Sequence, residues 1–209
     1  MAATRVAGER RTQTKGDRQR RAILDAVAGL LAEVPIEDLS IGRITARAGI
    51  TRSAYYFYFD GKYSAVAAAV ADAFADLDES TALLARLPGE DLADYARRMV
   101  ATAVATWRRH ASLLEACFQA RPVDDRLRAM LDERSDQLID RIRQVIDTER
   151  AGGAVTPVHP DTAELARLLG GMTLWSLREA TITGRDDGFD EVVDPLTAIW
   201  IAAIGAPRL

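Results

Sequence analysis

Residues 51–62 combine one basic side chain with closely spaced aromatic and hydroxyl groups, TRSAYYFYFDGK. In a helix that begins at Arg52, this residue shares one face with Ser53, Tyr56 and Phe57, because helical neighbours lie three or four residues apart. Arginine matches the geometry of guanine O6 and N7, and tyrosine hydroxyls donate hydrogen bonds to phosphate oxygens. The chemistry predicted for this stretch is therefore hydrogen bonding to base edges and phosphates.

The segment that must position these groups is predicted to form two short helices around a glycine turn. Apolar residues at helical spacing predict a first helix over 41–48, with Ser40 as its N-cap. Gly49 ends this helix, because glycine takes the left-handed conformation without strain. Thr51 offers an N-cap for a second helix over 52–59, and such a helix-turn-helix places its second helix in the DNA major groove. The predicted DNA-contacting residues are Ser40, Arg43, Thr51, Arg52, Ser53, Tyr55, Tyr56, Phe57, Tyr58 and Lys62.

Tyr55 has a second interpretation within this set. It lies four residues before Phe59, and both side chains can face the core together with Ile50. The exposed aromatic Tyr56, by contrast, is better explained by a surface that binds it.

The motif resembles the DNA-binding domain of the TetR family of bacterial transcriptional regulators over residues 18–66. The matching residues are Ile44, Ala46, Ala48, Gly49, Ile50, Thr51, Tyr56, Tyr58, Phe59 and Lys62. Tyr55 and Tyr58 depart from the family pattern, which often has leucine and histidine there. Downstream, the fragments VIDTERAGGA, ELARLLGGMTLW and AIWIAAIG are similar to the EthR-type branch. The resemblance implies an all-α homodimer that binds double-stranded operator DNA and responds to a small molecule.

Charge is divided unevenly along the 209 residues, whose net charge is −4. Residues 1–62 carry a balance of +4 and the remainder carries −8. A basic end directs one part of the molecule toward phosphate. Much of the positive excess lies in a tail over 1–16, expected to be flexible. This tail either follows the DNA backbone, which would make binding salt-dependent, or is an ordinary disordered tail.

Apolar periodicity predicts an all-α fold of about nine helices. A three-helix helix-turn-helix headpiece over 17–64 is expected to be joined by a long helix to a C-terminal helical bundle over 65–209. The first helix is expected over 17–33 and the joining helix over about 61–80. Later helices are expected over 91–109, 111–120, 124–150, 162–183 and 191–204, with the start of the last uncertain because of Pro195.

Large apolar residues gather in the predicted bundle and have two interpretations. They form either a plain core or a pocket for a small apolar molecule, since such sites lie between bundle helices. The family resemblance implies a pocket, although Gly170 and Thr173 depart from the polar residues expected there. The candidate ligand-binding residues are Tyr95, Met99, Trp107, Leu114, Phe118, Met130, Gly170, Thr173, Trp175 and Trp200.

The last two predicted helices carry more apolar surface than one buried face needs. Two copies could form a four-helix interface, and a symmetric dimer would read a palindromic operator. Gly170 and Gly171 would line either the pocket or this interface, and both remain open. The apolar and small residues at helical spacing are Leu165, Leu168, Leu169, Met172, Ser176, Val192, Val193, Leu196, Ile199 and Ala203.

Residues typical of catalytic and metal sites are sparse. Neither His110 nor His159 has a cysteine or carboxylate at metal-ligand spacing, and Cys117 is expected to be a buried thiol. No G-x-S-x-G, phosphate-binding loop or dinucleotide fingerprint occurs. We therefore expect no enzyme activity, metal or cofactor. No apolar run reaches the length of a membrane span, which favours a cytoplasmic protein.

Two hypotheses for the function follow. The first is a repressor that is released from its operator by a small apolar effector. The alternative is a DNA-binding regulator with a close-packed body and no effector, which acts constitutively or with a protein partner. An enzyme is the least favoured class.

Overall fold

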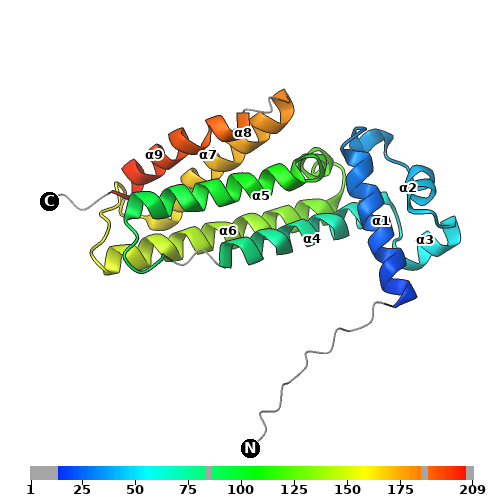
Figure 1. Cartoon of the computed structure of the whole chain (residues 1–209), viewed down its shortest axis with the longest axis horizontal. Coiled ribbons are helices and arrows are strands. Elements are labelled where there is room, and N and C mark those ends of the chain that lie inside the picture. Colours follow the sequence, from blue (N-terminus) through cyan, green and yellow to red (C-terminus); the bar gives the residue numbers. More distant parts are fainter. Residues whose placement is uncertain (1–13, 83–85, 185–187, 206–209) are drawn as a thin grey trace, which may run out of the picture.

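The fold is all-α, as predicted. The computed structural model describes residues 14–82, 86–184 and 188–205. Figure 1 places α1, α2 and α3 at one end and the remaining long helices side by side in an elongated bundle. None of the described helices is long and apolar enough to cross a membrane. The elements are α1 (Lys15–Leu31), η1 (Ile36–Asp38), α2 (Ile41–Ala48), α3 (Arg52–Tyr58), α4 (Lys62–Ala82), α5 (Leu92–Ala120), α6 (Asp125–Ala151), α7 (Thr162–Thr183), α8 (Gly188–Glu191) and α9 (Val193–Ile204).

The two helices of the motif begin where their caps predict. The Ser40 hydroxyl accepts a hydrogen bond from the Arg43 amide at 3.3 Å, and the Thr51 hydroxyl accepts one from the Ala54 amide at 3.2 Å. Gly49 follows α2 with a φ of 66°, a conformation that glycine adopts without a steric penalty. The predicted boundaries of α2 and the predicted start of α3 are confirmed.

The first helix begins at Lys15, earlier than the predicted Asp17. The Thr14 hydroxyl accepts from the Asp17 amide at 3.1 Å, and the Asp17 carboxylate accepts from the Thr14 amide at 3.0 Å. This reciprocal capping box stabilises an extra half turn. The last residues assigned to the flexible tail are therefore ordered, whereas residues 1–13 lie outside the described residues.

The bundle differs from the prediction at two places. α5 is one continuous helix of 29 residues, where two helices meeting near His110 were expected, because no glycine or proline interrupts this stretch. The last predicted helix, expected over 191–204, begins at Val193 as α9, and the short α8, which was not predicted, precedes it. Pro195 lies in the first turn of α9, where its missing amide proton costs no helical hydrogen bond.

One apolar core runs through both parts of the molecule. Ile23 and Tyr55 of the headpiece belong to the same cluster of contacting buried residues as Leu114 and Leu127 of the bundle. Cys117 lies in this core, and burial raises the pKa of its thiol to about 12. Because the headpiece and the bundle share a packed interior, repacking in the bundle can change how the headpiece is held.

Candidate nucleic-acid interface

α3 presents a mixed polar and aromatic face to solvent. Thr51, Arg52 and Ser53 are exposed at its start, and the side chains of Tyr56 and Phe57 are 56% and 82% exposed. The major groove is about 12 Å wide, which is wide enough to admit an α-helix. We call Arg52, Ser53, Tyr56 and Phe57 the reading face; contact between these residues and DNA stays a prediction.

The neighbouring helix α2 helps to place Arg52. The Arg52 guanidinium lies so close to α2 that a Cβ added to Gly42 would come within 3.1 Å of its Nη2 atom. Sequence analysis missed this role of Gly42, whose only signal is a glycine inside a helix, where it costs stability relative to alanine. Ser40 and Thr51 use their hydroxyl oxygens as caps, and a hydroxyl that accepts one bond can still donate another to phosphate.

Tyr55 does not face DNA, so its place in the predicted contact set is wrong. Its side chain is 0% exposed and packs against Phe59, with 5.8 Å between the ring centroids. The Tyr55 hydroxyl donates a hydrogen bond to the Gly61 carbonyl at 2.9 Å. Burial raises the pKa of Tyr55 to about 12, so the phenol remains a donor at neutral pH. Tyr55 therefore ties α3 to the start of α4.

We expect Tyr55→Phe to lower the free energy of unfolding by about 1 kcal/mol, because the Gly61 carbonyl loses a buried donor. Tyr56→Phe is the matched control, since the exposed Tyr56 should change stability by less than about 0.5 kcal/mol. Urea unfolding followed by circular dichroism measures both values. Equal losses in the two variants would contradict the role assigned to Tyr55.

Tyr58 and Lys62 make contacts that hold the headpiece together. The Tyr58 hydroxyl donates to Gln19 Oε1 of α1 at 3.2 Å. The Lys62 ammonium donates to the carbonyl oxygens of Ile36 and Glu37 in η1 at 2.8 and 3.2 Å. Two of the three Lys62 donors are thus used inside the protein. Its predicted contact with phosphate depends on the third.

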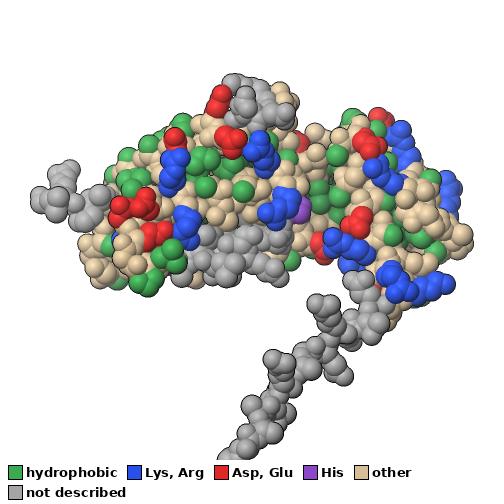
Figure 2. Space-filling model, in the orientation of Figure 1, with side chains coloured by type: hydrophobic (Ala, Val, Ile, Leu, Met, Phe, Trp, Pro, Cys, Tyr) green, Lys and Arg blue, Asp and Glu red, His purple; other side chains and the backbone are tan. Residues whose placement is uncertain are grey.

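Basic side chains cover much of the headpiece edge (Figure 2). Several make weak exposed contacts: Arg47 pairs with Glu33 at 2.7 Å, and the Arg43 guanidinium donates to the Asp38 carbonyl at 3.3 Å. Exposed pairs of this kind contribute little to stability. Phosphate groups can therefore replace these partners at low cost.

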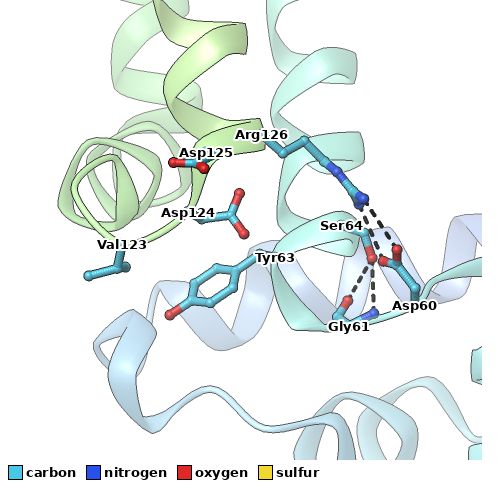
Figure 3. A pocket seen from close by; sticks show the side chains of 8 residues that line it. All are labelled: Asp60, Gly61, Tyr63, Ser64, Val123, Asp124, Asp125 and Arg126. Carbon is cyan, nitrogen blue, oxygen red and sulfur yellow. Dashed lines mark hydrogen bonds and ion pairs between the residues drawn. The ribbon is translucent and has the colours of Figure 1, made fainter.

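An ion pair joins the turn before α4 to the start of α6. Arg126 donates to both carboxylate oxygens of Asp60 at 3.3 and 3.2 Å. Figure 3 shows this pair beside an open pocket of about 480 Å³ at the junction of headpiece and bundle. The Asp124 carboxylate, which also lines this pocket, accepts a hydrogen bond from the Leu127 amide at 2.9 Å. Within the described ranges, no cluster of histidine, cysteine or acidic residues is suited to a metal ion.

Hydrogen bonding by Arg126 holds the pKa of Asp60 down to about 2. We expect Arg126→Gln to return this pKa toward 3.8. Because the folded-state pKa is lowered, the Asp60 carboxylate contributes its stability above about pH 4, and this contribution is lost as the pH falls toward 2. Carboxyl NMR titration measures the shift. Arg128→Gln is the control, because Arg128 lies two residues further along α6 and pairs with Asp125 instead. Equal Asp60 titration in both variants would contradict the assignment.

Most of the predicted ligand-binding residues lie inside the bundle. Two tryptophan indoles are hydrogen-bonded there: Trp107 donates to the Thr181 hydroxyl at 2.9 Å, and Trp200 donates to the Thr173 hydroxyl at 3.0 Å. These contacts link α5 to α7 and α9 to α7. Tyr95, Trp107, Leu114 and Gly170 are buried, and Met99, Phe118, Met130, Thr173 and Trp200 are partly buried.

The predicted set is too extended to line one small pocket. Tyr95 and Phe118 are separated by most of α5, which is about 35 Å at a rise of 1.5 Å per residue. The Arg98 guanidinium lies over the Tyr95 ring, 5.5 Å from the centroid of that ring. Phe118 instead packs near Trp107, with 6.1 Å between centroids, and both contact the main core together with Trp200. The Trp107 half of the bundle is the better candidate for a ligand site.

Gly170 and Gly171 face different surroundings on α7. A Cβ added to Gly170 would lie 3.4 Å from Ile142 Cδ1 of α6, whereas one added to Gly171 would meet no described atom within 4 Å. Gly170 therefore allows close packing of α6 against α7, and Gly171 lies on the outer surface. The sequence alone could not separate these two positions.

An apolar stripe runs along the outer face of α7. Leu168, Trp175 and Ile182 are each more than 60% exposed. Their spacing of seven residues aligns them, because seven residues make nearly two helical turns. We call these three residues the α7 stripe; Ile199 of α9 is also exposed. Trp175 belongs to this surface, so its assignment to an internal ligand pocket is wrong.

A helix-turn-helix with an exposed reading face defines a DNA-binding transcriptional regulator. Comparison with known families agrees: residues 23–69 match bacterial regulatory proteins of the tetR family, and residues 96–206 match the C-terminal domain of transcriptional regulator EthR. The chain belongs to the TetR family of transcriptional regulators, with a body of the EthR type. It is a regulator and not an enzyme.

Similar proteins support this family and fold. HTH-type transcriptional regulator EthR of Mycobacterium tuberculosis H37Rv is 27% identical over 203 residues, which cover 94% of this chain and 92% of that protein. The fatty acid degradation regulator FadR from Bacillus halodurans has the same fold, with a TM-score of 0.76 at 14% identity over 94% of this chain and 100% of that one. The reduced form of E. coli NemR gives 0.72 at 15% identity, covering 91% and 100%.

Proposed function

We propose that this regulator is a homodimeric repressor that binds a palindromic operator and is released by a small apolar molecule. The proposal rests on one observation: a single chain exposes both the reading face on α3 and the apolar α7 stripe on the bundle. In this proposal, residues 17–64 bind DNA, and residues 65–209 hold the effector and the second copy. The protein acts in the cytoplasm, where its operator lies.

The reading face divides DNA recognition among different side chains. Arg52 stands at the start of α3, the part of a recognition helix that reaches base edges, and arginine pairs best with guanine. Tyr56 is exposed and donates its hydroxyl to phosphate. The weakly paired arginines around α2 exchange their carboxylate and carbonyl partners for phosphates, which makes the affinity depend on salt.

The dimer forms through the α7 stripe and Ile199 of α9, packed against the same residues of the second copy. Such an isologous interface presents two reading faces related by a two-fold axis. Leu165 and Leu169 are buried within one chain, so they support the interface from behind and do not form it. Gly171 leaves room on α7 for close approach of the partner helix.

The effector binds between α5, α7 and α9, near Trp107 and Trp200. The hydroxyls of Thr173 and Thr181 are the polar groups at this place, and each already accepts a hydrogen bond from an indole. Effector binding repacks the apolar core that the bundle shares with the headpiece, and this repacking alters the position of α3. The effector must bind more tightly to the arrangement of the protein that does not fit DNA. Equal affinity for both arrangements would leave their populations unchanged.

A regulator without an effector is the second candidate. Both indoles have partners inside the bundle, and the described pocket of about 480 Å³ lies at the junction with the headpiece, outside the Trp107 region. A bundle that is already close-packed would leave DNA binding constitutive.

Selection of bound sequences from a random DNA library, followed by fluorescence anisotropy titration, tests these alternatives. The titration is repeated at two salt concentrations and with apolar compounds of increasing size. A palindromic sequence whose binding is released by one compound class supports the proposal. Selective binding that no compound disturbs favours the effector-free regulator. Recovery of single half-sites alone contradicts the homodimer.

Two variants separate base reading from phosphate contact in the same assay. Arg52→Ala should relax the sequence preference at one position of each half-site. Tyr56→Phe should weaken binding to all sequences similarly. The opposite pattern would mean that the reading face docks in a different orientation.

A further inference from the structure

Phe57 is the most exposed large apolar side chain among the described residues, at 82%. It lies on the reading face one helical turn after Ser53, so both side chains point the same way from α3. An exposed aromatic ring on a surface that is proposed to meet DNA needs a partner there.

The Phe57 ring is held in place by its neighbour. It packs edge-on against Tyr58, with 5.0 Å between centroids and an interplanar angle of 85°. Tyr58 is in turn fixed to α1, because its hydroxyl donates to Gln19 Oε1 at 3.2 Å. This chain of contacts connects the exposed ring to the rigid part of the headpiece, so that Phe57 is presented at a defined place.

The chemistry of the ring limits what it can recognise. A phenyl group has no hydrogen-bond donor or acceptor, so it cannot read the polar pattern of a base edge, and it gains little beside a charged phosphate. The apolar group that bases present in the major groove is the 5-methyl group of thymine. A thymine methyl is therefore the partner that matches Phe57.

We propose that Phe57 is a specificity-determining residue that recognises one thymine of each half-site through its 5-methyl group. This inference rests on the proposed binding of an operator by α3 and names one base that the operator contains. Phe57 adds an apolar contact to the hydrogen bonds of Arg52, and together they select a thymine and a guanine within reach of one short helix.

The test replaces each thymine of the selected operator, one at a time and symmetrically in both half-sites, by deoxyuridine. This change keeps the hydrogen-bonding groups of the base and removes only the methyl group. At one position, we expect the wild-type protein to lose about fourfold in affinity per half-site, which corresponds to one buried methyl group. In Phe57→Ala the same replacement should have no effect. Tyr56→Phe, changed at a neighbouring exposed aromatic, should keep the full sensitivity to deoxyuridine.

Two results would overturn the inference. The first is that the wild-type protein binds every deoxyuridine operator as tightly as the thymine operator; if Phe57→Ala then weakens binding to all of them equally, the ring lies against the sugar–phosphate backbone. The second is that Phe57→Ala keeps the wild-type sensitivity at the responsive position, which assigns the methyl contact to another residue. Wild-type binding to the thymine operator, measured in the same series, shows separately whether the proposed function holds.

Discussion

Trp175→Glu is expected to yield folded monomers that bind the operator at least ~100-fold more weakly than the wild-type protein. Trp175 lies in the middle of the α7 stripe and is exposed in a single chain, so a charged residue there leaves the chain's own core intact. In a dimer, the same change would bury two carboxylates against each other across the two-fold axis. A monomer contacts only one half-site. It therefore loses the extra affinity that a dimer gains by binding two linked half-sites, which is commonly about a hundredfold or more.

Sedimentation velocity measures the oligomeric state, and anisotropy on the selected operator measures the affinity. Val158→Glu is the control, because Val158 is as exposed as Trp175 but lies in the loop before α7. It should remain dimeric and bind DNA normally. A dimeric Trp175→Glu protein with normal affinity would place the interface on another surface.

The parts of the headpiece that could be predicted from sequence are those set by local interactions. Ser40, Gly49 and Thr51 act within three or four residues along the chain, so cap and turn preferences were enough to locate α2 and the start of α3. The aromatic run was harder. Tyr55 and Tyr56 are chemically identical neighbours, and only their angular position on α3 buries the first and exposes the second.

Contacts between distant segments could not be predicted. Lys62 binds carbonyls that lie 25 and 26 residues earlier, and Arg126 meets Asp60 across 66 residues. Each pair depends on how whole helices are arranged, and neither leaves a local pattern. Trp175 was misassigned for a related reason: a large apolar residue in a helix is predicted to be core, although an oligomer interface uses the same residue types.

The buried ion pair between α5 and α7 gives the second large prediction. Arg178 donates to both oxygens of Glu115 at 2.9 Å, and its guanidinium lies 4.6 Å from the Phe118 ring centroid. The Glu115 side chain is only 10% exposed. Removing its partner leaves a carboxylate that water reaches poorly, and loss of one member of such a pair is strongly destabilising. We expect Arg178→Met to lower the free energy of unfolding by about 3 kcal/mol.

Urea unfolding at one fixed protein concentration measures this loss, since the stability of a dimer depends on concentration. Arg167→Met is the matched control on the same helix, because Arg167 pairs with Glu164 where both side chains are more than half exposed; it should cost less than about 1 kcal/mol. The double change Glu115→Leu with Arg178→Leu should be more stable than Arg178→Met alone, because it removes the unpaired charge together with its partner. If the double variant is the less stable of the two, the stranded carboxylate of Glu115 is not the source of the loss.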